Sequence, residues 1–288
     1  MKSLSNKIDF ALIVSVKNAN PNGDPLDGNR PRTNYDGFGE MSDVCIKRKI
    51  RNRLQDMKKE IFVQSDENRV DEYRSLRARA DSHKDLKALT KDKEKYATLA
   101  CEKWIDVRSF GQVFAFTKND GSDAVSIGIR GPVSIQTATS VSPVDISSMQ
   151  ITKSVNLETG KDPDKKAPDT MGMKHRVDFG VYTIFGSINT QLASKTGFSD
   201  EDAKLIKEAL KTIFENDVSA ARPDGSMEVV RLYWWKHNNP NGQYSSAVVH
   251  RLLSITPKEE VEKPRKVDDY IIQCNELKDL NVEVFGLN

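Results

Sequence analysis

The feature that most constrains the fold is the alternation of residue types between Ile8 and Val16. Large apolar side chains occupy every second position of this run, and Asp9 and Ser15 lie among the residues between them. A period of two places the large apolar set on one face of a β-strand and the other residues on the opposite face. The run therefore predicts a half-buried strand in a sheet that rests on a core.

A basic amphipathic helix is predicted to begin after Ser42, which is a suitable N-cap residue with Asp43 in the first turn behind it. Apolar residues recur at helical spacing as far as Ile61 and give the helix a core face. Its cations have only Asp43, Asp56 and Glu60 as acidic neighbours in the sequence. They are Lys47, Arg48, Lys49, Arg51, Arg53, Lys58 and Lys59. Such clustering favours binding to nucleic-acid phosphates, and a merely solvated charged face is the alternative.

The segment from Asn18 to Arg32 is rich in Asn, Pro, Gly and Asp, and it predicts a long loop because these residues sustain neither helix nor strand. Arg30 and Arg32 add to the positive charge of the helix that follows. The acidic residues of the loop region are Asp24, Asp27 and Asp36. Carboxylates of this kind bind Mg²⁺, but Asp beside Gly and Pro is also common turn chemistry. A metal-dependent ribonuclease that uses Asp24 or Asp27 is therefore the second interpretation.

Composition excludes several classes of protein. With 37 % hydrophobic and 30 % charged residues among 288, the chain has the make-up of an ordinary globular protein. No stretch approaches the ~18 apolar residues of a membrane span, and the N-terminal run lacks a signal peptide's apolar block, so we expect a cytoplasmic location. Three widely spaced cysteines and four scattered histidines predict neither a disulfide framework, a zinc site nor a catalytic triad. The net charge of +2 does not by itself indicate a nucleic-acid partner.

The predicted elements follow an order that fits the split βαβ pattern of ferredoxin-like and RNA-recognition folds. Polar helices form an appended lobe, two strand-like segments then rejoin the main sheet, and a polar arm projects before the last three elements. After the first strand and helix the segments are polar helices (62–103), strands (104–116 and 125–139), arm (140–175), strand (175–189), a helix with a Ser199–Asp202 capping box, and strand (227–235).

Aromatic residues give two further expectations. RSFGQVFA, at 108–115, partly matches the base-stacking signature of RNA-recognition domains, but Phe114 and Phe116 alternate as core residues do. We expect them in the core. Trp234 and Trp235 are adjacent on a predicted strand, so one is expected to face the core and the other to face outward.

A family resemblance is carried by the run from Asn20 to Asn52, NPNGDPLDGNRPRTNYDGFGEMSDVCIKRKIRN. This run closely resembles the crRNA-binding backbone subunit of Cascade, the seventh CRISPR-associated family, in its type I-C form. The similarity continues in order through DVRSFG, GPVSIQTATSVSPVDISSMQITKS (131–154), MGMKHRVDFGVY (171–182) and ENDVSAARPDGSMEV (215–229). It therefore covers nearly the whole chain.

The resemblance implies an α+β fold shaped like a right hand. Its palm would be RNA-recognition-motif-like, that is ferredoxin-like, and split in sequence among residues 1–59, 104–139 and 176–288. A helical fingers insertion would occupy 60–103, and a β/loop thumb insertion would occupy 140–175.

The resemblance also implies a protein that has no catalytic activity and needs no cofactor or metal. It would hold a guide crRNA by its phosphates, stack with copies of itself in a helical filament, and present the guide for pairing with a target DNA strand. Its other partners would be the processing or cap subunit, the large subunit and the small subunit of Cascade, in antiviral defence.

Matched motif by motif, the resemblance places the guide-binding residues in two groups. The group that holds phosphates near the loop and helix is Asn22, Arg32, Ser42, Lys47, Arg48 and Arg51. The group around the palm and the base of the thumb is Ser140, Ser142, Met149, Lys174 and His175. Charge clustering adds Arg30. Met149 is expected to act as a wedge, because a flexible thioether can fill the gap beside a displaced nucleotide.

Overall fold

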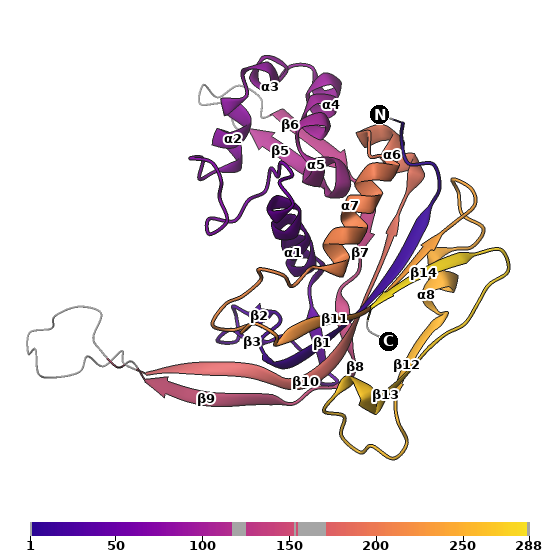
Figure 1. The fold of residues 1–288 in the computed structure, drawn as a ribbon. Helices are drawn as coiled ribbons and strands as arrows, with labels where there is room; N and C mark the ends of the chain where they lie inside the picture. The colour runs from indigo at the N-terminus through magenta and orange to yellow at the C-terminus, as the bar shows by residue number, and fades with distance from the viewer. Residues whose placement is uncertain (1, 117–124, 153, 155–170, 287–288) are drawn as a thin grey trace, which may run out of the picture.

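An antiparallel sheet forms the centre of the molecule (Figure 1). The computed structural model describes residues 2–116, 125–152, 154 and 171–286. The strand order is β14-β11-β1-β10-β8-β4, with β7 and β9 also paired to β10. The strands are β1 (Ile8–Ala19), β4 (Phe38–Met41), β7 (Val133–Ile135), β8 (Ala138–Pro143), β9 (Ile146–Thr152), β10 (Met171–Ile188), β11 (Met227–Lys236) and β14 (Asn281–Gly286). The α+β class is as predicted.

Helices cover one face of this sheet. They are α1 (Asp43–Asp56), α6 (Thr190–Thr196) and α7 (Asp200–Lys211). The predicted caps are confirmed, because Ser42 Oγ accepts from Cys45 N at 3.2 Å and Ser199 forms a capping box with Asp202. The α1 helix ends at Asp56, earlier than the apolar pattern predicts.

The second face of the sheet is also covered, which corrects the expectation of a half-buried first strand. After β11 the chain crosses this second face, where it forms α8 (Ser246–His250), β12 (Leu253–Pro257), the 3₁₀ turn η1 (Val267–Asp269) and β13 (Tyr270–Cys274). These elements bury Ala11 and Ile13 completely on the side of β1 that the alternation assigns to solvent. Trp234 and Trp235 face opposite sides, and both are buried, because each side has its own core.

A helical lobe stands apart from the sheet and has a third core. It contains α2 (Leu76–Ser82), α3 (Lys84–Ala88), α4 (Lys93–Lys103), α5 (Ile105–Phe110), β5 (Gly111–Phe116) and β6 (Val125–Arg130). The prediction that residues 104–116 form a strand is wrong for the first half, which is α5. The prediction that this segment and 125–130 rejoin the main sheet is also wrong, since β5 and β6 pair only with each other among the described strands. Phe114 is buried in the lobe core, as expected, and the side chain of Phe116 lies outside the described residues.

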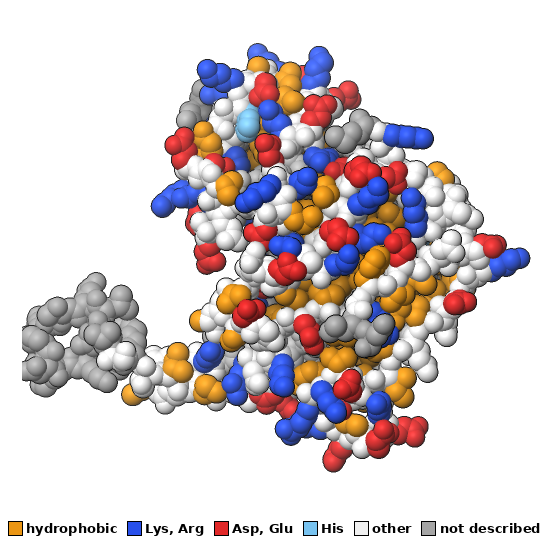
Figure 2. All heavy atoms as spheres, in the orientation of Figure 1, with side chains coloured by type: hydrophobic (Ala, Val, Ile, Leu, Met, Phe, Trp, Pro, Cys, Tyr) orange, Lys and Arg blue, Asp and Glu red, His pale blue; other side chains and the backbone are white. Residues whose placement is uncertain are grey.

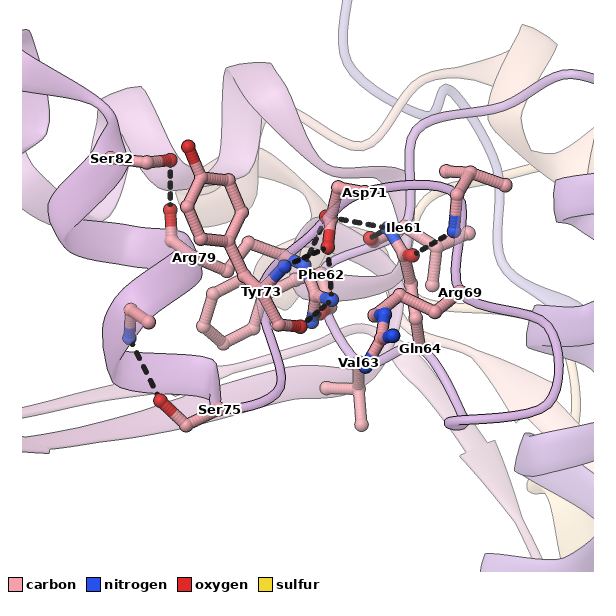
Figure 3. A network of polar contacts seen from close by, with 12 residues as sticks. Ile61, Phe62, Val63, Gln64, Arg69, Asp71, Tyr73, Ser75, Arg79 and Ser82 are labelled. Atoms are coloured by element: carbon pink, nitrogen blue, oxygen red, sulfur yellow. Dashed lines mark hydrogen bonds and ion pairs between the residues drawn. The ribbon is translucent and has the colours of Figure 1, made fainter.

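Arg79 organises the loop that leads into this lobe (Figure 3). Its guanidinium donates to both oxygens of Asp71, at 2.6 and 2.8 Å, and to the carbonyl oxygens of Phe62 and Tyr73, at 2.8 and 2.9 Å. A bidentate pair with a carboxylate has a fixed geometry, so it sets where the loop turns back on itself. The side chain of Arg79 is therefore part of the framework of the lobe.

The segment predicted as a loop contains a small hairpin, β2 (Gly23–Asp24) with β3 (Arg30–Pro31). Asn20 holds the hairpin to the end of β1 through a bond from its side-chain amide to the Asn29 carbonyl oxygen at 2.7 Å. Within the described part of the chain, no helix is long and apolar enough to cross a membrane.

Asp106, at the start of α5, joins the helical lobe to α1. It is fully buried and accepts from Arg51 Nε at 2.9 Å and from the backbone amides of Phe62 and Val63 at 2.8 and 3.1 Å. All three donors lose their acceptor if this carboxylate is removed. Leaving a buried cation unpaired costs far more than the net contribution of the pair.

We expect Asp106→Ala to lower the free energy of unfolding by about 3–5 kcal/mol. The measurement is the midpoint of urea unfolding followed by circular dichroism. Asp66→Ala is the matched control, because Asp66 pairs with Arg69 at the surface, 84 % exposed, and its loss is expected to cost no more than about 0.5 kcal/mol. Equal midpoints for the two variants would contradict the role assigned to Asp106.

A buried polar cluster fastens the C-terminal cover to β1. Asp9 accepts from His237 Nε2 at 2.8 Å and from Lys7 Nζ at 3.1 Å, and His250 Nε2 donates to the Gly186 carbonyl oxygen at 3.1 Å. Burial acts to raise the pKa of Asp9, but the hydrogen bonds from His237 and Ser246 and the charge of Lys7 outweigh it and lower the pKa. Burial lowers the pKa of His250 below its usual 6.5.

The lowered pKa of His250 gives a pH dependence with a definite sign. Above pH 6.5 the ring is neutral in both the folded and unfolded chain, and below it the unfolded chain takes up a proton first. Stability is therefore lost as pH falls from 6.5, by at most about 1.4 kcal/mol per pH unit for this group. We expect His250→Gln to reduce the difference between unfolding midpoints at pH 7.5 and 5.5. An unchanged difference would show that other groups set the dependence.

Candidate nucleic-acid interface

The cations of α1 meet carboxylates that are distant in the sequence. Lys49, only 4 % exposed, pairs with Asp217, and Arg53 pairs with Glu215. Arg51 pairs with Asp106, as described above, and stacks over the ring of Phe110 at 5.0 Å. The cations have few acidic neighbours in the sequence, but the fold brings distant carboxylates to three of them. Three of the seven cations, Lys49, Arg51 and Arg53, are therefore part of the internal framework.

Two predicted residues on α1 remain nearer the surface. Lys47 Nζ lies 2.9 Å from Asp43 on the same helix, with its side chain 24 % exposed, so the pair is open to competition from a phosphate. Arg48 Nη1 donates to the Val63 carbonyl oxygen at 2.6 Å. Burial, with a smaller effect from the neighbouring Arg51, lowers the pKa of Arg48.

Asn22 and Ser42 form one structural unit at the N-terminus of α1. Asn22 Oδ1 accepts from the Ser42 amide at 2.9 Å and from Ser42 Oγ at 3.1 Å, while Ser42 Oγ caps the helix. The backbone of Arg32 also donates to the Asn22 carbonyl oxygen at 2.9 Å. The two polar side chains thus fix the loop to the helix and bring Arg32 beside it.

The loop hairpin is bonded to the base of a projecting arm, which we define as β9 with residues 171–177 of β10 (Figure 1). Arg30 Nη1 donates to Ser148 Oγ at 2.8 Å, and that hydroxyl is 2.8 Å from His175 Nδ1. Lys174 lies opposite Met149 across the two strands of the arm. Lys174 forms no ion pair within the described residues.

These contacts place three predicted residues, Arg30, Arg32 and His175, along one track from the loop to the base of the arm. Met149 and Lys174 pair with each other one position along from Ser148 and His175, so they project from the opposite face of the arm. The two arginine side chains are each 37 % exposed, and among the described residues they form ion pairs with the loop carboxylates alone, at 3.7 Å for Arg30 with Asp27 and 3.3 Å for Arg32 with Asp24. Exposed guanidinium groups of this kind bind phosphate oxygens in pairs of hydrogen bonds. The track is suited to a phosphate backbone.

Ser140 and Ser142 do not join this track. Ser140 is buried, where its hydroxyl accepts from the Gly39 amide at 2.8 Å and donates to the Ser142 carbonyl oxygen at 2.7 Å. Ser142 Oγ lies 2.8 Å from the hydroxyl of Tyr270. Both serines therefore hold β8 to its neighbours, β4 and β13.

The arm has no core of its own and exposes apolar side chains on both of its faces. Figure 2 shows hydrophobic side chains along the arm and, over the rest of this view, positive and negative side chains interspersed. The exposed apolar residues of the arm are Met149 (39 %), Ile151 (48 %), Met171 (66 %) and Met173 (55 %). Because a two-stranded ribbon is barely stable alone in water, such a surface indicates a partner.

The structure adds residues that sequence reasoning missed. Ser148 links Arg30 to His175, although 118 residues separate it from Arg30. No spacing rule relates positions so far apart. Met171 and Met173 could have been found, since they alternate with small and polar residues just before a strongly predicted strand. Within the described residues, no three His, Cys, Asp or Glu side chains are placed to hold a metal ion.

The chain matches the family model described as CRISPR-associated protein Cas7 over residues 6–275. It is 25 % identical over 294 aligned positions to a curated protein of Haloferax volcanii called CRISPR-associated protein Cas7, covering 94 % of this chain and 82 % of that protein. Two solved structures are also similar. One is from a "CRISPR RNA-guided surveillance complex, pre-nicking", with TM-score 0.47, 13 % identity and 83 % of each chain covered. The other, from a "CRISPR RNA-guided surveillance complex", has TM-score 0.42 and 15 % identity, covering 80 % of this chain and 68 % of that one.

We expect Arg30→Ala with Lys174→Ala to weaken binding of single-stranded RNA equally for all sequences. Each lost phosphate contact is expected to lower the slope of log affinity against log salt by about 0.7. The measurement is fluorescence anisotropy with labelled RNA over a range of salt concentrations. The matched control is Lys91→Ala with Lys278→Ala, two exposed lysines away from the track. A slope that is the same in both double variants would rule out phosphate contacts at the base of the arm.

Proposed function

The chain belongs to the Cas7 family of CRISPR-associated proteins, and on that premise we propose that it is the guide-binding backbone subunit of a type I-C surveillance complex. Its ligand is a guide crRNA, held by the phosphates along the track from the loop hairpin to the arm. The bases stay free to pair with a target DNA strand. The protein has no catalytic role in this proposal and uses no cofactor.

The observation that carries the proposal is the bonded link between the basic loop and the base of the arm. Arg30 reaches Ser148 on β9, so the cations of the loop lie against the base of the arm, beside the N-terminus of α1. Lys47 lies one turn into the helix and extends the track. A line of cations held in fixed positions can follow a polymer of phosphates, whatever its sequence.

The arm supports the proposal that copies stack into a helical filament. Its exposed methionines and Ile151 are costly in water and become covered when a neighbouring copy and its guide lie against them. Met149 would press beside a displaced nucleotide, as a flexible thioether can. In this proposal the palm is RNA-recognition-like, the helical lobe acts as fingers, the segment 140–175 acts as the thumb, and residues 155–170 of it lie outside the described residues.

The other partners in the proposal are the processing or cap subunit, the large subunit and the small subunit of the complex, in the cytoplasm. The ribonuclease alternative depends on Asp24 or Asp27. Asp24 Oδ1 accepts from the Leu26 amide at 3.1 Å and lies 3.3 Å from Arg32 Nη2. This is a turn with an ion pair, and it favours a structural role for Asp24.

Co-purification and cleavage assays test the proposal together. We expect the chain expressed with a CRISPR array to co-purify with short RNA, and to leave labelled RNA intact in the presence of Mg²⁺. Cleavage that is lost in Asp24→Ala, with binding retained, would establish the ribonuclease instead. Binding that fails to protect any RNA fragment from added nuclease would contradict a backbone subunit that covers its guide.

A further inference from the structure

A groove crosses the second face of the sheet, on the side opposite α1 and α7. It consists of two adjoining cavities of about 680 and 450 Å³, which share Lys17, Phe179 and Arg265. Its floor is formed by the ends of β1, β10 and β11, and its wall by residues 263–272 of the C-terminal cover. At the far end it reaches Ser147 and Arg176, at the base of the arm. The shape is elongated and fits a chain better than a compact ligand.

The groove carries positive charge that the protein does not neutralise. Two cations along it are paired, Lys263 with Asp145 and Arg176 with Asp178 at 3.9 Å. The other four cations form no ion pair with a carboxylate within the described residues. They are Lys17, Arg231, Arg265 and Lys266. Two carboxylates face them, Glu228, which accepts from Ser15 Oγ at 3.0 Å, and Asp268. The free charge is therefore positive and attracts an anionic partner.

Aromatic rings lie among these cations. Phe179 on β10 is directly opposite Lys17 on β1, and the two side chains share one face of the sheet. Phe179 is half-buried, so one side of its ring meets the groove. Tyr270 also forms part of the wall, but it is 6 % exposed and its hydroxyl is held 2.8 Å from Ser142 Oγ, so Phe179 is the ring that is open to a base. Rings between cations suit bases and phosphates that alternate along a strand.

We propose that this groove binds a second stretch of single-stranded nucleic acid, separate from the track along α1 and the arm. Lys17, Arg265 and Lys266 contact its phosphates, and a base stacks on Phe179. An acidic peptide would satisfy the cations but would leave the ring of Phe179 without a partner to stack on it. Because the groove ends at the base of the arm, a strand leaving the arm can continue along the back of the sheet.

The test uses the full chain, freed of nucleic acid, and labelled oligonucleotides of about eight nucleotides, as both uridine RNA and thymidine DNA. We expect Lys17→Ala with Arg265→Ala to lower the salt slope by about 1.4, twice the value for one contact. Both residues are exposed, so the fold is retained. Phe179→Leu is expected to lower affinity about tenfold with little change in slope. Lys91→Ala with Lys278→Ala is the matched control.

Photo-crosslinking with 4-thiouridine or 4-thiothymidine then locates the strand. We expect crosslinked peptides that contain Phe179 or Tyr270, and we expect them to persist in the Arg30→Ala, Lys174→Ala variant. That persistence separates this groove from the guide track, so either site can fail alone. Crosslinks confined to α1 and the arm would overturn the proposal. Displacement of the oligonucleotide by polyglutamate at equal concentration would also overturn it, and would indicate an acidic peptide as the ligand. A changed oligomeric state of the nucleic-acid-free Lys17→Ala, Arg265→Ala variant would overturn it as well, and would indicate a second copy of the chain.

Discussion

The buried carboxylate of Asp106 is the contact on which the arrangement of the helical lobe depends. It sits at the start of α5 and accepts hydrogen bonds from the side chain of Arg51 on α1 and from two backbone amides just beyond that helix. One carboxylate on α5 therefore binds both α1 and the segment that follows α1 in the chain. Because buried donors must find acceptors, the lobe has one compatible position relative to α1.

The ion pair of Arg51 with Asp106 is one of several that give the cations of α1 a structural role. Positive charge on α1 looks like a binding surface in the sequence, yet Lys49, Arg51 and Arg53 are each held by a carboxylate from another element. Pairs of this kind contribute little net stability compared with apolar packing, but they specify which elements meet. Apart from Lys47, the cations of the proposed guide track lie outside the helix, so the proposed interface is beside α1 and the helix supports it.

Features that depend on neighbouring residues could be predicted from the sequence, and features that depend on contacts between distant segments could not. The strand predicted at 8–16, the Ser42 cap and the Ser199 capping box depend on residues within a few positions of one another, and all three are confirmed. The burial of Trp235 depends on elements that follow it in the chain, from α8 to β13, and the partners of Lys49 and Arg51 lie more than fifty residues away. Alternation shows which residues share a face of a strand, but not whether a later segment returns to cover the other face. For the same reason the β5–β6 hairpin was assigned to the wrong sheet.

Covering both faces of the sheet has a consequence for how nucleic acid can be held. In an open sheet, one whole face is available as a platform, whereas here α8, β12 and β13 cover much of the second face and leave the groove beside Phe179 open. On the first face, α1 and α7 fill the space above the sheet. Outside this groove, the proposed binding is therefore confined to the edges of the sheet, where loops and the arm extend past the covered area. Cations at an edge meet a strand through its phosphates, which leaves the bases directed away from the protein and free to pair.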